Sequence, residues 1–114
     1  MSAMGTLNQY REFVKQIIKK HNQYKPSYGE IEQYTIFDEL GDRYLLMSTR
    51  WHKHYRMYGC LIHIDIKDGK IWIQYNGTET GVAKELLEFG VPKQDIVLAF
   101  HSPAARKHTE FAVG

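Results

Sequence analysis

The chain has 114 residues, of which 43% are hydrophobic, and its 15 Lys and Arg against 13 Asp and Glu give a formal net charge of +2. This length suits one domain with one ordinary core, and the composition argues against intrinsic disorder and against a strongly basic nucleic-acid-binding protein. The apolar runs are short for a membrane span and no secretory signal is recognisable, so we expect a single cytoplasmic domain over residues 1–114.

The N-terminal region predicts an amphipathic helix from Thr6 to about Tyr24. Its apolar stripe recurs at three- and four-residue intervals, the spacing of one helix face, and consists of Leu7, Tyr10, Val14, Ile17, Ile18 and His21. Thr6 has the side chain of an N-cap, and Pro26 follows where the helix should end. Lys15 and Lys19 lie off the stripe, which is typical of a solvated helix face.

Three strands are predicted after this helix. Apolar and polar residues alternate in "EIEQYTIFD", and "LGD" at residues 40–42 supplies a turn into "RYLLMSTRW". A longer strand follows in "YRMYGCLIHIDI", and "RWHKHYR", residues 50–56, spans the connection between the two. As continuous strand, this heptapeptide would place four basic side chains on one face, and their repulsion favours a turn instead; the four are Arg50, His52, His54 and Arg56.

The clearest structural signal is "IHIDIKDGKIWIQYN". Asp68 and Gly69 between alternating apolar residues predict a β-hairpin with a type I′ turn, in which both residues have positive φ. With Lys67 opposite Lys70, the apolar face of the hairpin pairs Ile66 with Ile71, Ile64 with Ile73 and Ile62 with Tyr75.

The opposite face of this hairpin is expected to be mixed in character. It would place His63 opposite Gln74 and Asp65 opposite Trp72. A slip of one residue would exchange the two faces, so the turn should fix which side is buried.

The last third of the chain predicts another helix and two more strands. We expect Thr78 to cap a helix through "GVAKELLEFG", with Glu79 at the favourable end of the helix dipole and Gly90 in the left-handed C′ position. "IVLAF" and "HTEFAV" are predicted as short strands. The sum is an α+β fold: an antiparallel sheet of about five to six strands, with the N-terminal helix and a second helix packed on it.

The sequence shows no catalytic or metal-binding motif. Its six histidines lack the ligand spacing of zinc sites, and Cys60 is the only cysteine. His101 and Ser102 are adjacent, so in an extended segment they point to opposite sides and do not form a base and nucleophile. Cys60 is expected to be a buried thiol rather than a reactive one. We therefore expect no enzyme activity, no metal and no cofactor.

The "RWHKHYR" stretch leaves two interpretations open. Its cations and aromatic rings could contact phosphates and stack on bases, or it could be an exposed connection, since loops often collect charge. Direct DNA binding would use the first helix together with this stretch, and the candidate residues are Lys15, Lys19, Arg50, Lys53 and Arg56.

Three blocks of sequence resemble the XisI family of fdxN element excision controlling factors. They are "YGCLIHIDIKDGKIWIQYNGTE", "LLEFGVPKQDIVLAFHSP" and the ending "TEFAVG", and the likeness extends from about Leu7 to the last residue. The family pattern includes Trp51 and Arg56 but not His52 and His54. The resemblance implies a small non-catalytic protein of cyanobacterial type, which acts with an XisH-like partner of nuclease fold in controlling a site-specific DNA rearrangement.

The family has no catalytic residues that the resemblance could transfer. A partner-binding surface is expected on the mixed face of the hairpin and on the C-terminal loop, because polar and aromatic side chains together are typical of interfaces. The expected residues are His63, Asp65, Lys70, Trp72, Gln74, His101 and Arg106. We also expect a homo-oligomer, most simply a dimer, and contact with DNA that is mainly indirect.

Overall fold

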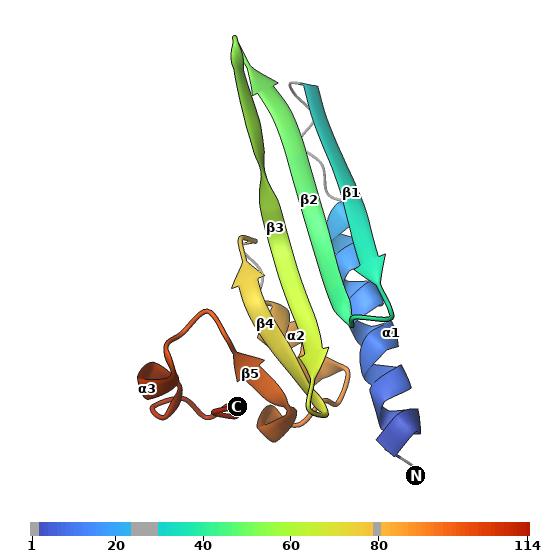
Figure 1. The fold of residues 1–114 in the computed structure, drawn as a ribbon, viewed down its shortest axis with the longest axis vertical. Coiled ribbons are helices and arrows are strands. Elements are labelled where there is room, and N and C mark those ends of the chain that lie inside the picture. Colours follow the sequence, from blue (N-terminus) through green and yellow to red (C-terminus); the bar gives the residue numbers. More distant parts are fainter. Residues whose placement is uncertain (1–2, 24–29, 79–80) are drawn as a thin grey trace.

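Helices cover one face of a twisted sheet and leave the other face open (Figure 1). The computed structural model describes residues 3–23, 30–78 and 81–114. Helix α1 (Ala3–Asn22) precedes the strands β1 (Glu30–Asp38), β2 (Arg43–His52), β3 (Tyr55–Lys67) and β4 (Lys70–Asn76). Helix α2 (Val82–Glu88) and the 3₁₀ turn η1 (Lys93–Asp95) lead to β5 (Ile96–Leu98), and the short helix α3 (Pro103–Arg106) follows.

The five strands form one sheet in the order β1-β2-β3-β4-β5. The first four are antiparallel neighbours, and β5 lies parallel to β4. The predicted α+β class is confirmed, with two helices packed on the sheet, but the expectation of a purely antiparallel sheet is wrong at its last strand. Helix α2 lies between β4 and β5 in the chain and forms the crossover that a parallel pair requires. In the described part of the chain, no helix is both long and apolar enough to cross a membrane.

The core lies between the helices and the inward side of β2, β3 and β4. The predicted apolar stripe of α1 is buried there, with Val14, Ile17 and Ile18 at most 2% exposed. Its counterpart on the sheet is the predicted isoleucine slab, made of Ile62, Ile64, Ile66, Ile71 and Ile73. Burying each such side chain stabilises the fold by about 1.5–3 kcal/mol before the cost of ordering the chain.

Helix α1 begins one turn earlier than predicted. It starts at Ala3, so Thr6 lies inside the helix and is not its N-cap; Ala and Met, which precede Gly5, are strong helix formers that extend it. The helix ends at Asn22, and the predicted end at Tyr24 lies outside the described residues. Arg11 joins α1 to the β1–β2 turn through a bidentate ion pair with Asp42. Its Nε donates to Oδ1 at 2.7 Å and its Nη2 donates to Oδ2 at 3.0 Å.

The strands β2 and β3 run further into "RWHKHYR" than expected. Only Lys53 and His54 form the turn, and the register places Arg50 opposite Met57 and Trp51 opposite Arg56. The expected turn over the whole heptapeptide is therefore wrong. The repulsive row does not arise, because the hairpin reverses the chain and puts Arg50 and Arg56 on opposite faces of the sheet.

The Asp68–Gly69 turn has the predicted geometry. The two residues have φ values of 54° and 76°, and Ile66 lies opposite Ile71 as expected. Beyond Ile64 opposite Ile73, a β-bulge shifts the register, so that Tyr75 pairs with His63 rather than with Ile62. The expected pairs of Ile62 with Tyr75 and His63 with Gln74 are therefore wrong, since the extra residue in β4 turns Tyr75 onto the open face.

The C-terminal third is less regular than predicted. The N-cap of α2 is Gly81 rather than Thr78, whose hydroxyl donates to Asn76 Oδ1 at 2.6 Å, and Glu79 lies outside the described residues. Strand β5 covers only Ile96–Leu98 of "IVLAF". "HTEFAV" is not a strand: its described pairing with the sheet is an isolated bridge between Ala112 and Val97. The predicted left-handed Gly90 is confirmed, with φ of 94°.

Replacing Gly69 with alanine should destabilise the protein. Its backbone φ of 76° lies in the left-handed region, which is unfavourable for a residue with a Cβ. No atom lies within 4 Å of the added carbon, so the cost comes from the backbone conformation and amounts to about 1–2 kcal/mol. Gly59→Ala is the matched control, because an added Cβ at Gly59 likewise meets no atom within 4 Å, whereas Gly59 lies in strand β3 and its φ is not positive. Urea unfolding should show a lower free energy of unfolding for Gly69→Ala alone; equal values for the two variants would contradict this account of the turn.

Two core tyrosines should make stability fall at alkaline pH. Burial and hydrogen bonds to Asp95 and Asp42 raise the pKa of Tyr10 and of Tyr44 to about 12. The unfolded chain releases these phenolic protons near pH 10 whereas the fold retains them, so their stabilisation is complete below pH 10 and is lost between about 10 and 12. Melting temperatures should decline less steeply over this range in Tyr10→Phe and Tyr44→Phe than in the wild type, and parallel declines would be the contrary result.

Candidate partner-binding face

The sheet face turned away from α1 and α2 is here called the outer face. Directly opposed residues of antiparallel strands share a face, and the register links this face from β4 across to β1: Trp72, Asp65, Tyr75, His63, Leu45, Ile36, Met47, Tyr34, Thr49, Tyr58, Trp51 and Arg56. Four of its large apolar or aromatic side chains are strongly exposed: Ile36 at 44%, Trp51 at 47%, Tyr58 at 68% and Tyr75 at 50%.

A hydrogen-bonded polar group occupies the lower part of the outer face. Asp65 Oδ1 lies 2.8 Å from His63 Nε2, and Asp65 Oδ2 accepts from Gln74 Nε2 at 3.3 Å. The His63 and Asp65 side chains keep 31% and 20% of their surface exposed. The carboxylate therefore orients both neighbours while all three remain within reach of solvent.

Trp72 lies next to this group and is partly covered by two cations. Its indole Nε1 donates to the backbone oxygen of Lys67 at 3.0 Å, and Lys67 Nζ lies 4.0 Å from the ring centroid. The Arg106 guanidinium lies 5.6 Å from the same ring. Cation–π contacts of this kind hold the indole in one orientation.

Arg106 joins the C-terminal segment to the sheet. It donates from Nε to the carbonyl oxygen of His101 at 3.0 Å, and from its terminal nitrogens to those of Ala99 and Val113, both at 3.3 Å. These bonds close the chain from Ala99 to Val113 into a loop whose arginine contacts Trp72. Arg106 thus has a structural duty that the sequence did not reveal.

The predicted partner-binding residues fall into one cluster and one outlier. His63, Asp65, Trp72 and Gln74 lie together on the outer face, Lys70 lies beside them opposite Lys67, and Arg106 reaches them from the C-terminal loop. His101 is exposed and its ring lies beside Phe100, with ring centroids 4.5 Å apart, while its backbone oxygen accepts from Arg106.

An aromatic group that the sequence analysis missed occupies the upper part of the outer face. Burial and a hydrogen bond with Tyr58 raise the pKa of Tyr34. The Arg56 guanidinium lies 5.2 Å from the Trp51 ring. The sequence does carry a signal for this group: the side-chain alternation of β2 and β3 continues into "RWHKHYR", whereas a turn was predicted over that whole stretch.

The five cations proposed for DNA binding do not share one surface. Lys15 is hydrogen-bonded to Glu12 and Glu39, which raises its pKa, and it lies at the β1–β2 turn. Lys53 forms the turn at the other end of β2, a strand of 10 residues and about 33 Å. Lys19 lies over the Phe37 ring, whereas Arg50 and Arg56 point to opposite sides of the sheet.

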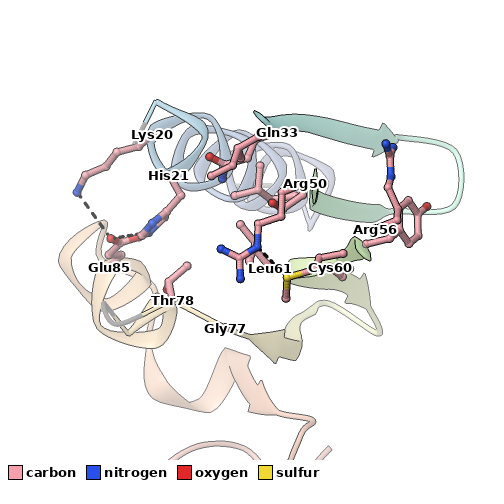
Figure 2. Close-up of a pocket in the computed structure, with 16 residues that line it drawn as sticks. Lys20, His21, Gln33, Arg50, Arg56, Cys60, Leu61, Gly77, Thr78 and Glu85 are labelled. Atoms are coloured by element: carbon pink, nitrogen blue, oxygen red, sulfur yellow. Dashed lines mark hydrogen bonds and ion pairs between the residues drawn. The ribbon is translucent and has the colours of Figure 1, made fainter. Parts of the chain in front are cut away.

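A groove of about 1080 Å³ lies on the helix side of β2 and β3, beyond the end of α1. Figure 2 shows the Arg50 guanidinium directed into it and the Arg56 side chain directed away. On the opposite wall, buried Glu85 is hydrogen-bonded to His21 Nε2 at 3.0 Å and lies 3.7 Å from Lys20 Nζ.

Cys60 also lines the groove and is half-buried. Its thiol donates to the backbone oxygen of Ile62 at 3.0 Å, and burial raises its pKa. A raised pKa keeps the sulfur protonated at neutral pH, which agrees with the expected unreactive thiol. Among the described residues, no group of three or more His, Cys, Asp or Glu side chains could hold a metal ion.

The fold and the outer face define a small two-layer α+β domain with helices on one side of the sheet and an open sheet surface on the other. A family model described as XisI protein matches residues 4–113, and the chain belongs to the XisI family. No curated protein matches the chain.

Two solved structures share the fold along almost the whole chain. A XisI-like protein from Anabaena variabilis ATCC 29413 is 39% identical, with a TM-score of 0.89, over 95% of this chain and 99% of that one. The fdxN element excision controlling factor XisI from the same organism is 34% identical, with a TM-score of 0.84, over 96% of this chain and 99% of that one. The family expected from the three sequence blocks is confirmed.

Replacing Arg106 with glutamine should release the C-terminal loop without unfolding the domain. The variant loses most of the bonds to the carbonyl groups of Ala99, His101 and Val113 and the contact with Trp72, so amide hydrogen exchange in residues 99–114 should accelerate at least about tenfold. Exchange in α1 and β2 should not change.

Lys107→Gln is the control for the Arg106 variant, because Lys107 is exposed and its side chain has no hydrogen bond or ion pair among the described residues. Unchanged exchange of residues 99–114 in Arg106→Gln, or equal acceleration in Lys107→Gln, would contradict the structural duty assigned to Arg106.

Proposed function

We propose that this protein is a non-catalytic controlling factor for the excision of a DNA element, and that it acts by binding an XisH-like partner through its outer face. Membership of the XisI family supports the excision role, as does the likeness to a solved excision controlling factor. In this proposal the cutting and joining of strands belong to a separate recombinase, and the cytoplasm is the compartment where all of them meet.

The observation that carries the proposal is the one-sided cover of the sheet. Both α1 and α2 pack on the inward face, and Phe13 of α1 stacks on Phe89, just after α2, at 4.7 Å between ring centroids. The outer face keeps Trp51, Tyr58 and Tyr75 between 47% and 68% exposed. Large apolar surfaces rimmed by polar side chains typically mark sites of protein association.

The lower part of the outer face has the composition of an interface centre. Trp72 and Tyr75 are aromatic anchors, and aromatic residues with arginine supply most of the binding energy in protein interfaces. Asp65 already orients His63 and Gln74, so a partner would meet side chains whose rotamers are fixed before binding. Such preorganisation lowers the entropic cost of association.

Direct DNA binding is less well supported than protein binding. A phosphate-binding surface needs several cations that track one backbone. Lys15 is occupied by two carboxylates and Lys53 lies at the far end of β2. We therefore retain indirect contact with DNA, through the partner, as part of the proposal.

The partner is tested by co-purification of the tagged protein with an XisH-like protein and by titration calorimetry of the pair. We expect a complex at micromolar concentration or below, which Trp72→Ala weakens at least about tenfold, because truncating an aromatic anchor commonly costs more than about 1.4 kcal/mol. Lys70→Glu should also weaken it without disturbing the C-terminal loop.

Lys84→Glu is the control for this experiment, since Lys84 is exposed on α2 in the helix layer. Loss of binding in that variant alone would place the interface on the helices and contradict the outer face. Absence of any complex, together with salt-sensitive retention of excision-border DNA that Arg50→Glu abolishes, would replace the proposal by direct DNA binding.

A further inference from the structure

Strand β3 extends well past its neighbour β4. It has 13 residues whereas β4 has 7, and their pairing ends where Ile62 lies opposite Asn76. One further backbone bond follows, from Gly77 N to Leu61 O at 2.7 Å. Within the described ranges, that edge of β3 has no strand partner over residues 55–61, as Figure 1 shows beyond the end of β4.

This edge lacks the usual protection of an exposed strand. Natural edges carry proline, several charges or a covering loop, whereas "YRMYGCL" has a single charged residue, Arg56. Tyr55 and Tyr58 are 73% and 68% exposed, and Met57 is 43% exposed. At Gly59, which lines the groove, an added Cβ would meet no atom within 4 Å, so there is open space over this face of the strand.

The groove on the helix side opens along the same stretch of β3. Residues 57–61 form part of its lining, and Leu46 and Leu61 contribute apolar surface. Arg50 lies on β2 opposite Met57, and its Nε donates to Met57 Sδ at 3.1 Å. The side chain therefore reaches from β2 toward β3 and brings its guanidinium into the groove (Figure 2), where no carboxylate of the described residues forms an ion pair with it.

We propose that residues 55–61 of β3 are an acceptor edge for an extended acidic peptide segment of another protein, which adds a strand in line with β4 and sets a carboxylate against Arg50. Backbone hydrogen bonds along the edge would supply affinity, and alternate side chains would supply specificity. The side chains on the helix side would pass over Met57 and Leu61 and reach the guanidinium. This surface is separate from the lower outer face, so the inference does not rest on the proposed function.

Charge favours an acidic segment over a second copy of this chain. Residues 55–61 of a second copy contain no carboxylate that could pair with Arg50, and they would add a further cation, Arg56. Arginine binds carboxylates through two parallel N–H donors, which a second copy of residues 55–61 has no side chain to accept.

The experiment uses the full chain and a fluorescein-labelled peptide, Val-Glu-Val-Asp-Val-Glu-Val, in a fluorescence anisotropy titration. We expect a dissociation constant of about 10–100 μM at low salt, at least tenfold weaker binding by Arg50→Glu, and an intermediate loss for Arg50→Gln. Amide exchange of residues 55–61 should slow when the peptide is bound.

Two control peptides separate backbone pairing from simple charge attraction. A peptide with lysine in place of each acidic residue should bind at least tenfold more weakly, and so should the acidic peptide with alternate amides methylated. Lys107→Glu is the control variant, because it makes the same charge change away from the groove.

The proposal is overturned by any of three results: equal binding of the acidic and lysine peptides, equal losses in Arg50→Glu and Lys107→Glu, or retained binding of the methylated peptide. A fourth result would also overturn the proposal: slow amide exchange of residues 55–61 in the absence of peptide, with protection that increases as the protein concentration rises. That result would assign the edge to a second copy of the chain.

Discussion

The structure depends on the packing of one helical stripe against one isoleucine slab. Val14, Ile17 and Ile18 of α1 pack on the inward side of the sheet, they share one buried cluster with Ile64 and Ile73, and all five are almost fully buried. Helix α2 packs on the same side of the sheet, so the domain has two layers rather than three. The apolar stripe of α1 and the isoleucine slab of the sheet bury each other within these two layers. The outer face and the upper edge of β3 therefore remain available for other molecules.

The elements that the sequence predicted well are those set by local rules. The period of α1, the strand alternation and the Asp68–Gly69 turn follow from neighbouring residues alone. Three other features depend on contacts between distant segments: the β-bulge in β4, the parallel pairing of β5 with β4, and the isolated bridge that joins residues 109–113 to β5. The prediction of a turn over residues 50–56 was wrong because it assumed that the basic side chains would repel one another along one continuous strand. A two-residue turn instead divides the segment between two strands and places Arg50 and Arg56 on different faces.

The candidate site could be predicted in part for the same reason. Alternation along β3 and β4 placed His63, Asp65 and Trp72 on one face without any knowledge of the fold. Tyr75 was assigned to the core because a bulge leaves no simple mark in the sequence. The role of Arg106 could not be found either, since its partners at Ala99 and Val113 come together only when the C-terminal loop closes.

The two tryptophans lie in separate surroundings. Trp51 lies beside Arg56 near the end of the β2–β3 hairpin, and Trp72 lies between the hairpin turn and the C-terminal loop. Indole emission responds to the polarity and the charges around the ring, so a single-tryptophan form of the protein would give an optical signal from one end of the molecule at a time. The chain thus carries two built-in spectroscopic probes, and ligands that settle at opposite ends can be told apart without an added dye.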